Sequence, residues 1–172
     1  QFTQAAVSTD GLRFGSEPAI TRTPYLRVFQ HEGYYYGVSR LGRLWRSKDP
    51  LASFEPGPNP FRDGPYAGRI RHVALVKRGA RLHVFFTGIG DVPERVMMST
   101  IDLGGDWTAW KATAPVDVLQ PETGYECTNH PNRPSEAGDI AVPVRQIRDP
   151  FVFEEDGRLY LFYSICGEQG IA

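Results

Sequence analysis

The sequence predicts an all-β protein built from repeated units of four antiparallel strands. Three observations support this fold class: a hairpin pattern that occurs three times, a composition that favours strands and turns, and the lack of a sustained helical period. The 172 residues include 8 Tyr and 10 Phe, which favour strands, and 18 Gly and 14 Pro, which favour turns. No segment keeps a 3.6-residue apolar period beyond two turns without Gly or Pro.

The repeated element has the pattern of a β-hairpin. Each copy is an apolar run, a polar turn ending in Gly, and a second run rich in aromatic residues, and the copies lie at residues 25–37, 72–86 and 149–163. Gly33, Gly79 and Gly157 supply the positive φ that such turns need. Because both runs are apolar at most positions, the strands are expected to be covered on both faces, as in sheets stacked face to face.

A second element follows the hairpins. Its pattern is clearest from Ser8 to Phe14, and similar patterns lead from Ser47 to Phe54 and from Ser99 to Trp107. We interpret it as a third strand, a turn and a fourth strand, in which Ser and Asp side chains accept hydrogen bonds from turn amides. Together with a hairpin it makes a unit of roughly 40 to 50 residues, the size of a β-propeller blade.

The chain is therefore predicted to be a single partial β-propeller domain. Residues 1–20 form half a blade, 24–58 and 70–113 form blades, 114–146 form a long insertion loop, and 147–172 form half a blade. A closed propeller needs at least about four blades, more than the two and a half to three counted here. We expect a truncated product, or a ring completed by another chain or by homo-oligomerisation.

Charge and cysteine content limit the function classes. The net charge is −1 with both signs interspersed, which favours neither nucleic acid nor a membrane as partner. The apolar stretches have strand length, too short for a transmembrane helix. No signal-peptide pattern starts the chain, so it is either cytoplasmic or secreted or periplasmic with its signal removed. Cys127 and Cys166 form one disulfide or remain two thiols, and no spacing indicates zinc.

The hairpin alignment predicts where a site would lie. The innermost strand of each propeller blade runs along the central axis, so the starts of these strands line one funnel. Tyr25, His72 and Asp149 stand at the three starts. An aromatic ring, an imidazole and a carboxylate that converge on one cavity would form a candidate site. The alternative is that Asp149, which precedes Pro150, only caps a turn.

Residues 144–163 carry a resemblance to a known superfamily. Arg148-Asp149-Pro150 before an apolar strand and the Asp156-Gly157 turn resemble the glycoside hydrolases with five-bladed propellers, which include family 43 and the arabinanase, xylosidase, invertase and levansucrase relatives. The pattern from Ser8 to Phe14 also recurs there. The resemblance spans most of this chain and about half of a full-length member. It implies hydrolysis of an oligo- or polysaccharide by carboxylate acid–base catalysis. The competing interpretation is a non-catalytic carbohydrate-binding or assembly module.

The resemblance also implies roles for individual carboxylates. Asp149 matches the Asp of the Arg-Asp-Pro triplet, which stabilises the transition state in invertase-like members. Glu126 is the candidate general acid, because a Glu-Cys pair carries the acid in those enzymes, although there the pair follows the triplet. Its alternatives are a solvated loop glutamate, or another acid of the loop in the same role: Glu122, Glu136 or Asp139. The expected first-blade nucleophile or base has no matching Asp in the N-terminal half.

The remaining predicted site residues are expected to bind substrate. They are Arg148, which is alternatively a structural partner of Asp149, together with His72, Tyr25, Arg71, Tyr125 and His130. No cofactor is expected, and a divalent cation held on the axis near His72 is the less favoured alternative. Trp107 and Trp110 are expected to fill the space between blades rather than to stack on sugars.

Overall fold

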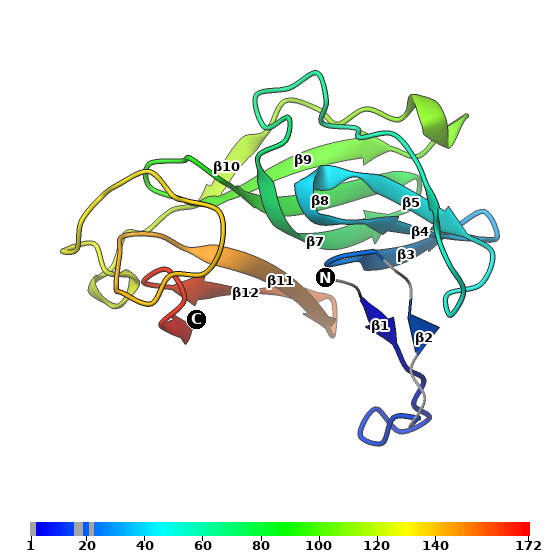
Figure 1. Ribbon diagram of the computed structural model, residues 1–172, viewed down its shortest axis with the longest axis horizontal. Coiled ribbons are helices and arrows are strands. Elements are labelled where there is room, and N and C mark those ends of the chain that lie inside the picture. Colours follow the sequence, from blue (N-terminus) through cyan, green and yellow to red (C-terminus); the bar gives the residue numbers. More distant parts are fainter. Residues whose placement is uncertain (1–2, 16–18, 21–22) are drawn as a thin grey trace.

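The computed structural model describes residues 3–15, 19–20 and 23–172, and these form antiparallel sheets set side by side (Figure 1). A short ladder pairs β1 (Gln4–Ala5) with β2 (Ala19–Ile20). The first blade then runs in chain order through β3 (Arg27–His31), β4 (Tyr34–Val38), β5 (Leu44–Ser47) and β6 (Glu55–Pro56).

The second and third blades repeat this order. The second contains β7 (Ile70–Arg78), β8 (Arg81–Gly88), β9 (Val96–Asp102) and β10 (Val116–Leu119), and the third contains β11 (Arg148–Glu155), β12 (Arg158–Ile165) and β13 (Gly170–Ile171). Three 3-10 turns complete the described part of the chain, which has no α-helix: η1 (Arg40–Gly42), η2 (Trp107–Ala109) and η3 (Gly124–Glu126).

The three predicted hairpins are confirmed, and all have two-residue turns. The last pairs before these turns are His31 with Tyr34, Arg78 with Arg81, and Glu155 with Arg158. In the third hairpin Gly157 has a φ of +74°, the left-handed conformation that favours glycine. The repeated hairpin thus gives each blade its two inner strands.

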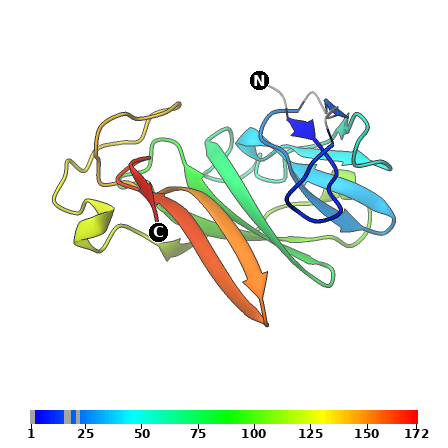
Figure 2. The same cartoon turned by 90° about the horizontal axis from the view of Figure 1, so that it is seen from below.

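Apolar side chains fill the space between neighbouring blades. Tyr36 of the first blade packs against Trp107 and Trp110, which lie between β9 and β10 of the second blade, with ring centroids 5.8 and 5.0 Å from that of Tyr36. Both tryptophans are buried, so the predicted packing role is confirmed. A smaller cluster with Val96, Ile147 and Tyr163 joins the second blade to the third, whose hairpin lies beside the second sheet in Figure 2.

The second blade differs from the sequence interpretation in its fourth strand. Trp107, placed there by the pattern, lies in η2, where the Asp106 carboxylate accepts a hydrogen bond from the Thr108 amide at 2.9 Å. The fourth strand is β10, inside the segment predicted as an insertion loop. The reason is packing: the Trp107 ring lies against the backbone of Gly57 in the first blade, so the chain leaves the sheet before pairing resumes.

A disulfide anchors the long segment between β10 and β11, residues 120–147. Cys127, which follows η3, forms a disulfide with Cys166, which follows β12, so the alternative of two free thiols is excluded. In the described part of the chain, no helix is long and apolar enough to cross a membrane. Nor do these residues gather three or more His, Cys, Asp or Glu side chains into a group that could hold a metal ion.

Candidate functional site

The structure brings together the three side chains at the inner strand starts. Tyr25 precedes β3, His72 lies near the start of β7, and Asp149 is the second residue of β11. His72 Nδ1 is hydrogen-bonded to Asp149 Oδ1. The Tyr25 ring lies against the imidazole, with centroids 4.4 Å apart and planes tilted by 43°. Three segments far apart in sequence therefore meet at one point.

These residues line a cavity of about 350 Å³. Acidic and basic side chains line the cavity, and an aromatic ring forms part of its wall. The lining residues are Tyr25, Arg40, Arg71, His72, Gly138, Asp139, Asp149 and Glu168. A concave pocket with a few convergent polar groups is the usual form of a small-ligand site.

The backbone is irregular where it presents these groups. Tyr25 and Asp149 have φ angles of +51° and +50°, the left-handed region that costs non-glycine residues about 1 kcal/mol or more. The β7–β8 ladder shifts register between Ile70 and Val73, and the β11–β12 ladder shifts between Arg148 and Phe151. Such irregularities redirect side chains. Here they lie at the same place in two blades, beside His72 and Asp149.

The contacts of Asp149 do not support a role limited to capping a turn. Its two carboxylate oxygens bind side chains distant in sequence, His72 and, at 3.3 Å, the Ser164 hydroxyl. Burial raises the pKa of Asp149, but the hydrogen bond and attraction of His72, the Ser164 hydroxyl and the charge of Arg71 outweigh it, so that the pKa is lowered. Asp149 is therefore ionised at neutral pH, which suits a charge-stabilising carboxylate or a base.

A buried ionic network lies next to the cavity. The fully buried Glu94 carboxylate accepts a hydrogen bond from Arg71 Nε at 2.8 Å, and its other oxygen lies 3.0 Å from Arg148 Nε. Arg148 also binds Glu168 at 2.8 Å and Gln146 at 2.7 Å. Glu94, Gln146 and Glu168 were not predicted from the sequence, because no local pattern distinguishes them.

The same network holds the long loop in place. Arg71 Nη1 and Arg148 Nη1 both donate to the Gly138 carbonyl, at 2.9 and 3.1 Å. Asp139, the next residue, lines the cavity. Arg71 also lines the cavity, whereas the Arg148 side chain is 1% exposed and is not among the lining residues. The contacts of Arg148 indicate a structural role, but with Glu94, Gln146 and Glu168 rather than as the predicted partner of Asp149, which binds His72 and Ser164.

Glu126, the predicted general acid, does not line this cavity. It is buried in η3, where its carboxylate accepts from the amides of Glu122 and Thr123 at 2.8 and 2.9 Å and from the hydroxyls of Thr123 and Tyr163 at 2.9 and 2.8 Å. Burial raises the pKa of Glu126, but these hydrogen bonds lower it by more, so that the pKa is below its ordinary value. The Thr123–Glu126 pair is a capping box, which makes Glu126 a part of the loop structure.

Replacing Glu126 with Gln is expected to lower the free energy of unfolding at neutral pH by about 1–3 kcal/mol, because a charged acceptor of four hydrogen bonds is lost. The pKa of Glu126 is lower in the folded state, so this stabilisation is complete above the unfolded-state pKa. It disappears as the pH falls through the folded-state pKa, and the difference between the two proteins should shrink below about pH 4. Urea unfolding at several pH values measures this. Glu122→Gln, at an exposed position, is the matched control.

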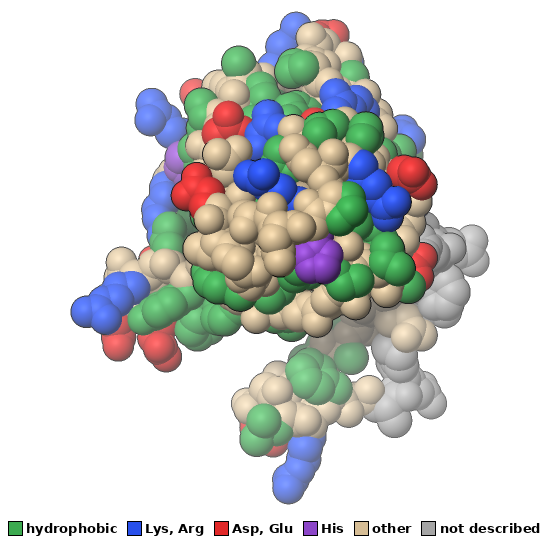
Figure 3. All heavy atoms as spheres, turned by 90° about the vertical axis from the view of Figure 1, so that its left-hand side faces the viewer, with side chains coloured by type: hydrophobic (Ala, Val, Ile, Leu, Met, Phe, Trp, Pro, Cys, Tyr) green, Lys and Arg blue, Asp and Glu red, His purple; other side chains and the backbone are tan. Residues whose placement is uncertain are grey.

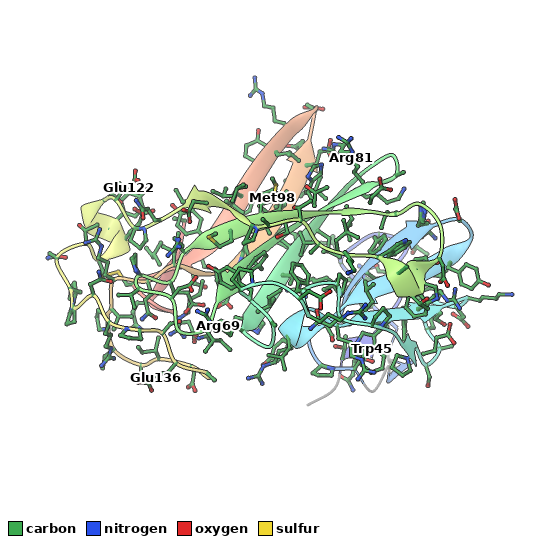
Figure 4. All side chains as sticks on the ribbon, turned by 90° about the horizontal axis from the view of Figure 1, so that it is seen from above. Trp45, Arg69, Arg81, Met98, Glu122 and Glu136 are labelled. Atoms are coloured by element: carbon green, nitrogen blue, oxygen red, sulfur yellow. A yellow bond between two sulfur atoms is a disulfide. The ribbon has the colours of Figure 1, made fainter. Side chains whose placement is uncertain are left out.

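The other predicted residues of the long segment lie elsewhere. Tyr125 is 58% exposed beside the disulfide, and neither Tyr125 nor His130 is among the cavity-lining residues. Figure 4 shows Glu122 and Glu136 apart from each other at the loop-rich end of the molecule. Of the acids that competed for the acid role in this loop, only Asp139 lines the cavity. On the surface of this end, acidic and basic side chains are interspersed (Figure 3).

The sequence is similar to that of a viral protein over most of its length. No family model matches the chain. An uncharacterized protein of Acanthamoeba polyphaga mimivirus is 41% identical over 179 residues, which cover 97% of this chain and 50% of that protein. The chain thus spans about half the length of this relative.

Two solved structures show the class of fold. The α-L-arabinanase of Cellvibrio cellulosa matches with a TM-score of 0.54 and 11% identity, over 87% of this chain and 46% of that chain. A Bacillus subtilis arabinanase matches with a TM-score of 0.50 and 12% identity, over 83% and 48%. The predicted fold class is confirmed: the chain is all-β, with antiparallel sheets of three or four strands, and its fold is similar to about half of these arabinanase β-propellers.

Proposed function

We propose that this chain carries a sugar site of the glycoside-hydrolase type and acts on the glycosidic bonds of an oligo- or polysaccharide. The observation that carries the proposal is the convergence of Tyr25, His72 and Asp149 on one cavity at the inner strand starts of an arabinanase-like fold. The arabinanase neighbours make arabinan the first polymer to test.

The cavity offers groups for charge stabilisation, for protonation of the leaving oxygen and for sugar binding. Asp149, kept ionised by His72, would stabilise positive charge at the anomeric carbon. Asp139 is our candidate for the acid that protonates the leaving oxygen, because it lines the same cavity. Tyr25 would cover a sugar face, and Arg40 would donate to hydroxyls.

The hydrolysis balances without a cofactor. The acid gives its proton to the glycosidic oxygen as the bond to the anomeric carbon breaks. A water oxygen then bonds to that carbon, and the proton released by the water returns to a carboxylate.

Asp149→Asn is expected to reduce kcat/KM on a responsive substrate by about 100-fold or more, because the variant keeps the shape of the side chain and loses its charge. The assay uses a panel of aryl glycosides and arabinan, with Asp139→Asn and Glu126→Gln tested beside it. Asp156→Asn, at an exposed hairpin turn, makes the same chemical change away from the cavity and should be neutral. Full activity of Asp149→Asn would remove the site assignment, and a loss in Glu126→Gln alone would move the acid role back to Glu126.

A second candidate function is sugar binding without turnover. The position of Glu126 favours it, because the acid suggested by the resemblance is used as a loop cap outside the cavity. A binding module would show saturable binding of an oligosaccharide at His72 and no release of reducing sugar. The signals of the His72 imidazole nitrogens in NMR spectra report the binding, and an assay of reducing sugar in the same samples distinguishes the two cases.

A further inference from the structure

A second cavity lies beside the second blade, apart from the candidate sugar site. It has a volume of about 290 Å³ and shares no lining residue with the cavity around His72. Its walls come from the connection between β6 and β7, from strands β8 and β9, and from the segment that leads into β10. Figure 1 shows both connections on the side of the second sheet away from the β11–β12 hairpin.

Three aromatic rings line this second cavity, which we call the aromatic cavity. The Phe86 ring stands nearly perpendicular to the rings of Phe61 and Tyr66, with centroids 5.5 and 5.1 Å away and interplanar angles of 72 and 74°. The Tyr66 hydroxyl donates to the buried Asp91 carboxylate at 2.7 Å, so Tyr66 offers the cavity its ring rather than a free hydroxyl. Because aromatic rings pack well edge to face, these walls favour a ligand with a ring of its own.

The size of the aromatic cavity suits a small ring compound. An engineered apolar cavity of about 150 Å³ binds benzene, and pockets for drug-sized ligands begin at about 300 Å³. A volume of about 290 Å³ therefore fits a single substituted ring and leaves little room for a chain of rings.

One buried polar group at the aromatic cavity has no partner. Ser99 alternates in β9 with Met97 and Ile101, whose side chains lie in the core shared with the first blade, so its side chain points to the same face. Ser99 is 1% exposed, and its hydroxyl has no hydrogen-bond partner among the described residues. An unsatisfied buried hydroxyl is destabilising, and a polar atom of a ligand would remove this penalty. A serine hydroxyl moves between staggered positions, so it can turn towards such an atom.

The charged residues at the aromatic cavity neutralise each other. Lys111 Nζ lies 3.2 Å from Asp63 Oδ2, and no other described residue that lines the cavity is charged. A neutral ligand therefore fits better than an ion. A sugar fits poorly as well, because it carries a hydroxyl group on almost every carbon and would leave most of them without partners against these walls.

We propose that the aromatic cavity binds a small neutral aromatic compound with one hydroxyl group, that is, a phenol. Its ring packs against Phe61, Tyr66 and Phe86, and its hydroxyl forms a hydrogen bond with Ser99. The binding is non-covalent, and it does not depend on the proposed sugar site or on its reaction.

Amide NMR signals of Ala112 and Thr113, which both line the aromatic cavity, test the proposal in titrations of the protein. Phenol is expected to shift these signals in a saturable manner. Toluene has nearly the same shape without the hydroxyl, and it should bind about three- to tenfold more weakly. Arabinose should leave the signals unchanged. The absence of a saturable response to phenol, or an equal response to arabinose, overturns the proposal.

Ser99→Ala tests the hydrogen bond. The variant lacks the hydroxyl and should bind phenol and toluene with equal affinity. Because the hydroxyl has no partner in the protein, its removal should not impair folding, and circular dichroism establishes this. A preference for phenol as large as that of the wild type overturns the assignment of Ser99.

Ala112→Phe tests the location, because the larger side chain fills the cavity from its half-buried wall. It should weaken the binding of phenol by about tenfold or more. Ala109→Phe is the matched control, at an exposed position of η2 that does not line the cavity, and should bind phenol like the wild type. Unchanged phenol binding by folded Ala112→Phe places the ligand elsewhere and overturns the site. If Ala112→Phe does not fold, the comparison of phenol with toluene in Ser99→Ala decides.

Discussion

Replacing Glu94 with Ala is expected to lower the free energy of unfolding by about 3–5 kcal/mol. Glu94 is fully buried and lies 2.8 Å from Arg71 Nε and 3.0 Å from Arg148 Nε. Removing it leaves two buried guanidinium groups without their shared carboxylate. Because these side chains are only 6 and 1% exposed, solvent compensates little for the lost carboxylate, and the loss is much larger than the worth of an ion pair on the surface.

Urea unfolding of Glu94→Ala measures this effect. The matched control is Glu154→Ala, which removes an ion pair of 2.9 Å to Arg78 whose side chains are 46 and 47% exposed. That variant should lose less than about 1 kcal/mol, because solvent screens the pair. Equal effects of the two substitutions would contradict the description of the Glu94 network as a buried framework of the site.

Removing the disulfide is expected to cost about 4 kcal/mol, on the chain-entropy model of a closed loop of about 40 residues. Cys127 and Cys166 are separated by 39 positions, and the loop they close contains Asp139, Arg148 and Asp149. In the absence of the bond, the unfolded chain regains the freedom that this closure removes. The folded segment that carries Asp139 also loses an anchor.

The measurement compares urea unfolding of the wild type with and without a reductant. The Cys127→Ser/Cys166→Ser double variant should match the reduced wild type and should not respond to the reductant. If reduction leaves the unfolding midpoint of the wild type unchanged, the bond does not constrain this loop.

The sequence predicts the hairpins well because their determinants are local. Asp156-Gly157 and the apolar runs beside it specify a turn and two strands within about 15 residues. Once the repeat is recognised, the propeller geometry places Tyr25, His72 and Asp149 at equivalent strand starts. The convergence of these three side chains therefore follows from the repeat, without any knowledge of the residues between them.

The parts that could not be predicted depend on distant partners. Glu94 has no local signature, and its partners Arg71 and Arg148 lie 23 and 54 positions away. Asp139 enters the cavity because both arginines hold the neighbouring Gly138 carbonyl, a contact that only the folded chain defines.

Glu126 is a different case, because its position was signalled locally. Thr123 precedes it by three residues, the spacing of a capping box, and this pattern indicates a structural role for the carboxylate. The capping-box spacing therefore predicts the surroundings of Glu126 better than its resemblance, with Cys127, to the acid of invertase-like enzymes does.

The central claim is that Tyr25, His72 and Asp149 together bind a sugar. NMR of the His72 imidazole, during a titration with arabino-oligosaccharides and the other sugars of the panel, tests this claim most directly. We predict that the ring signals of His72 shift in a saturable manner, and that Asp149→Asn weakens the response. His83, which is hydrogen-bonded to Thr100 and is not a cavity-lining residue, is the internal reference and should not move. Signals of His72 that stay unchanged with every sugar, or that move no more than those of His83, would contradict the assignment of this cavity as a sugar site.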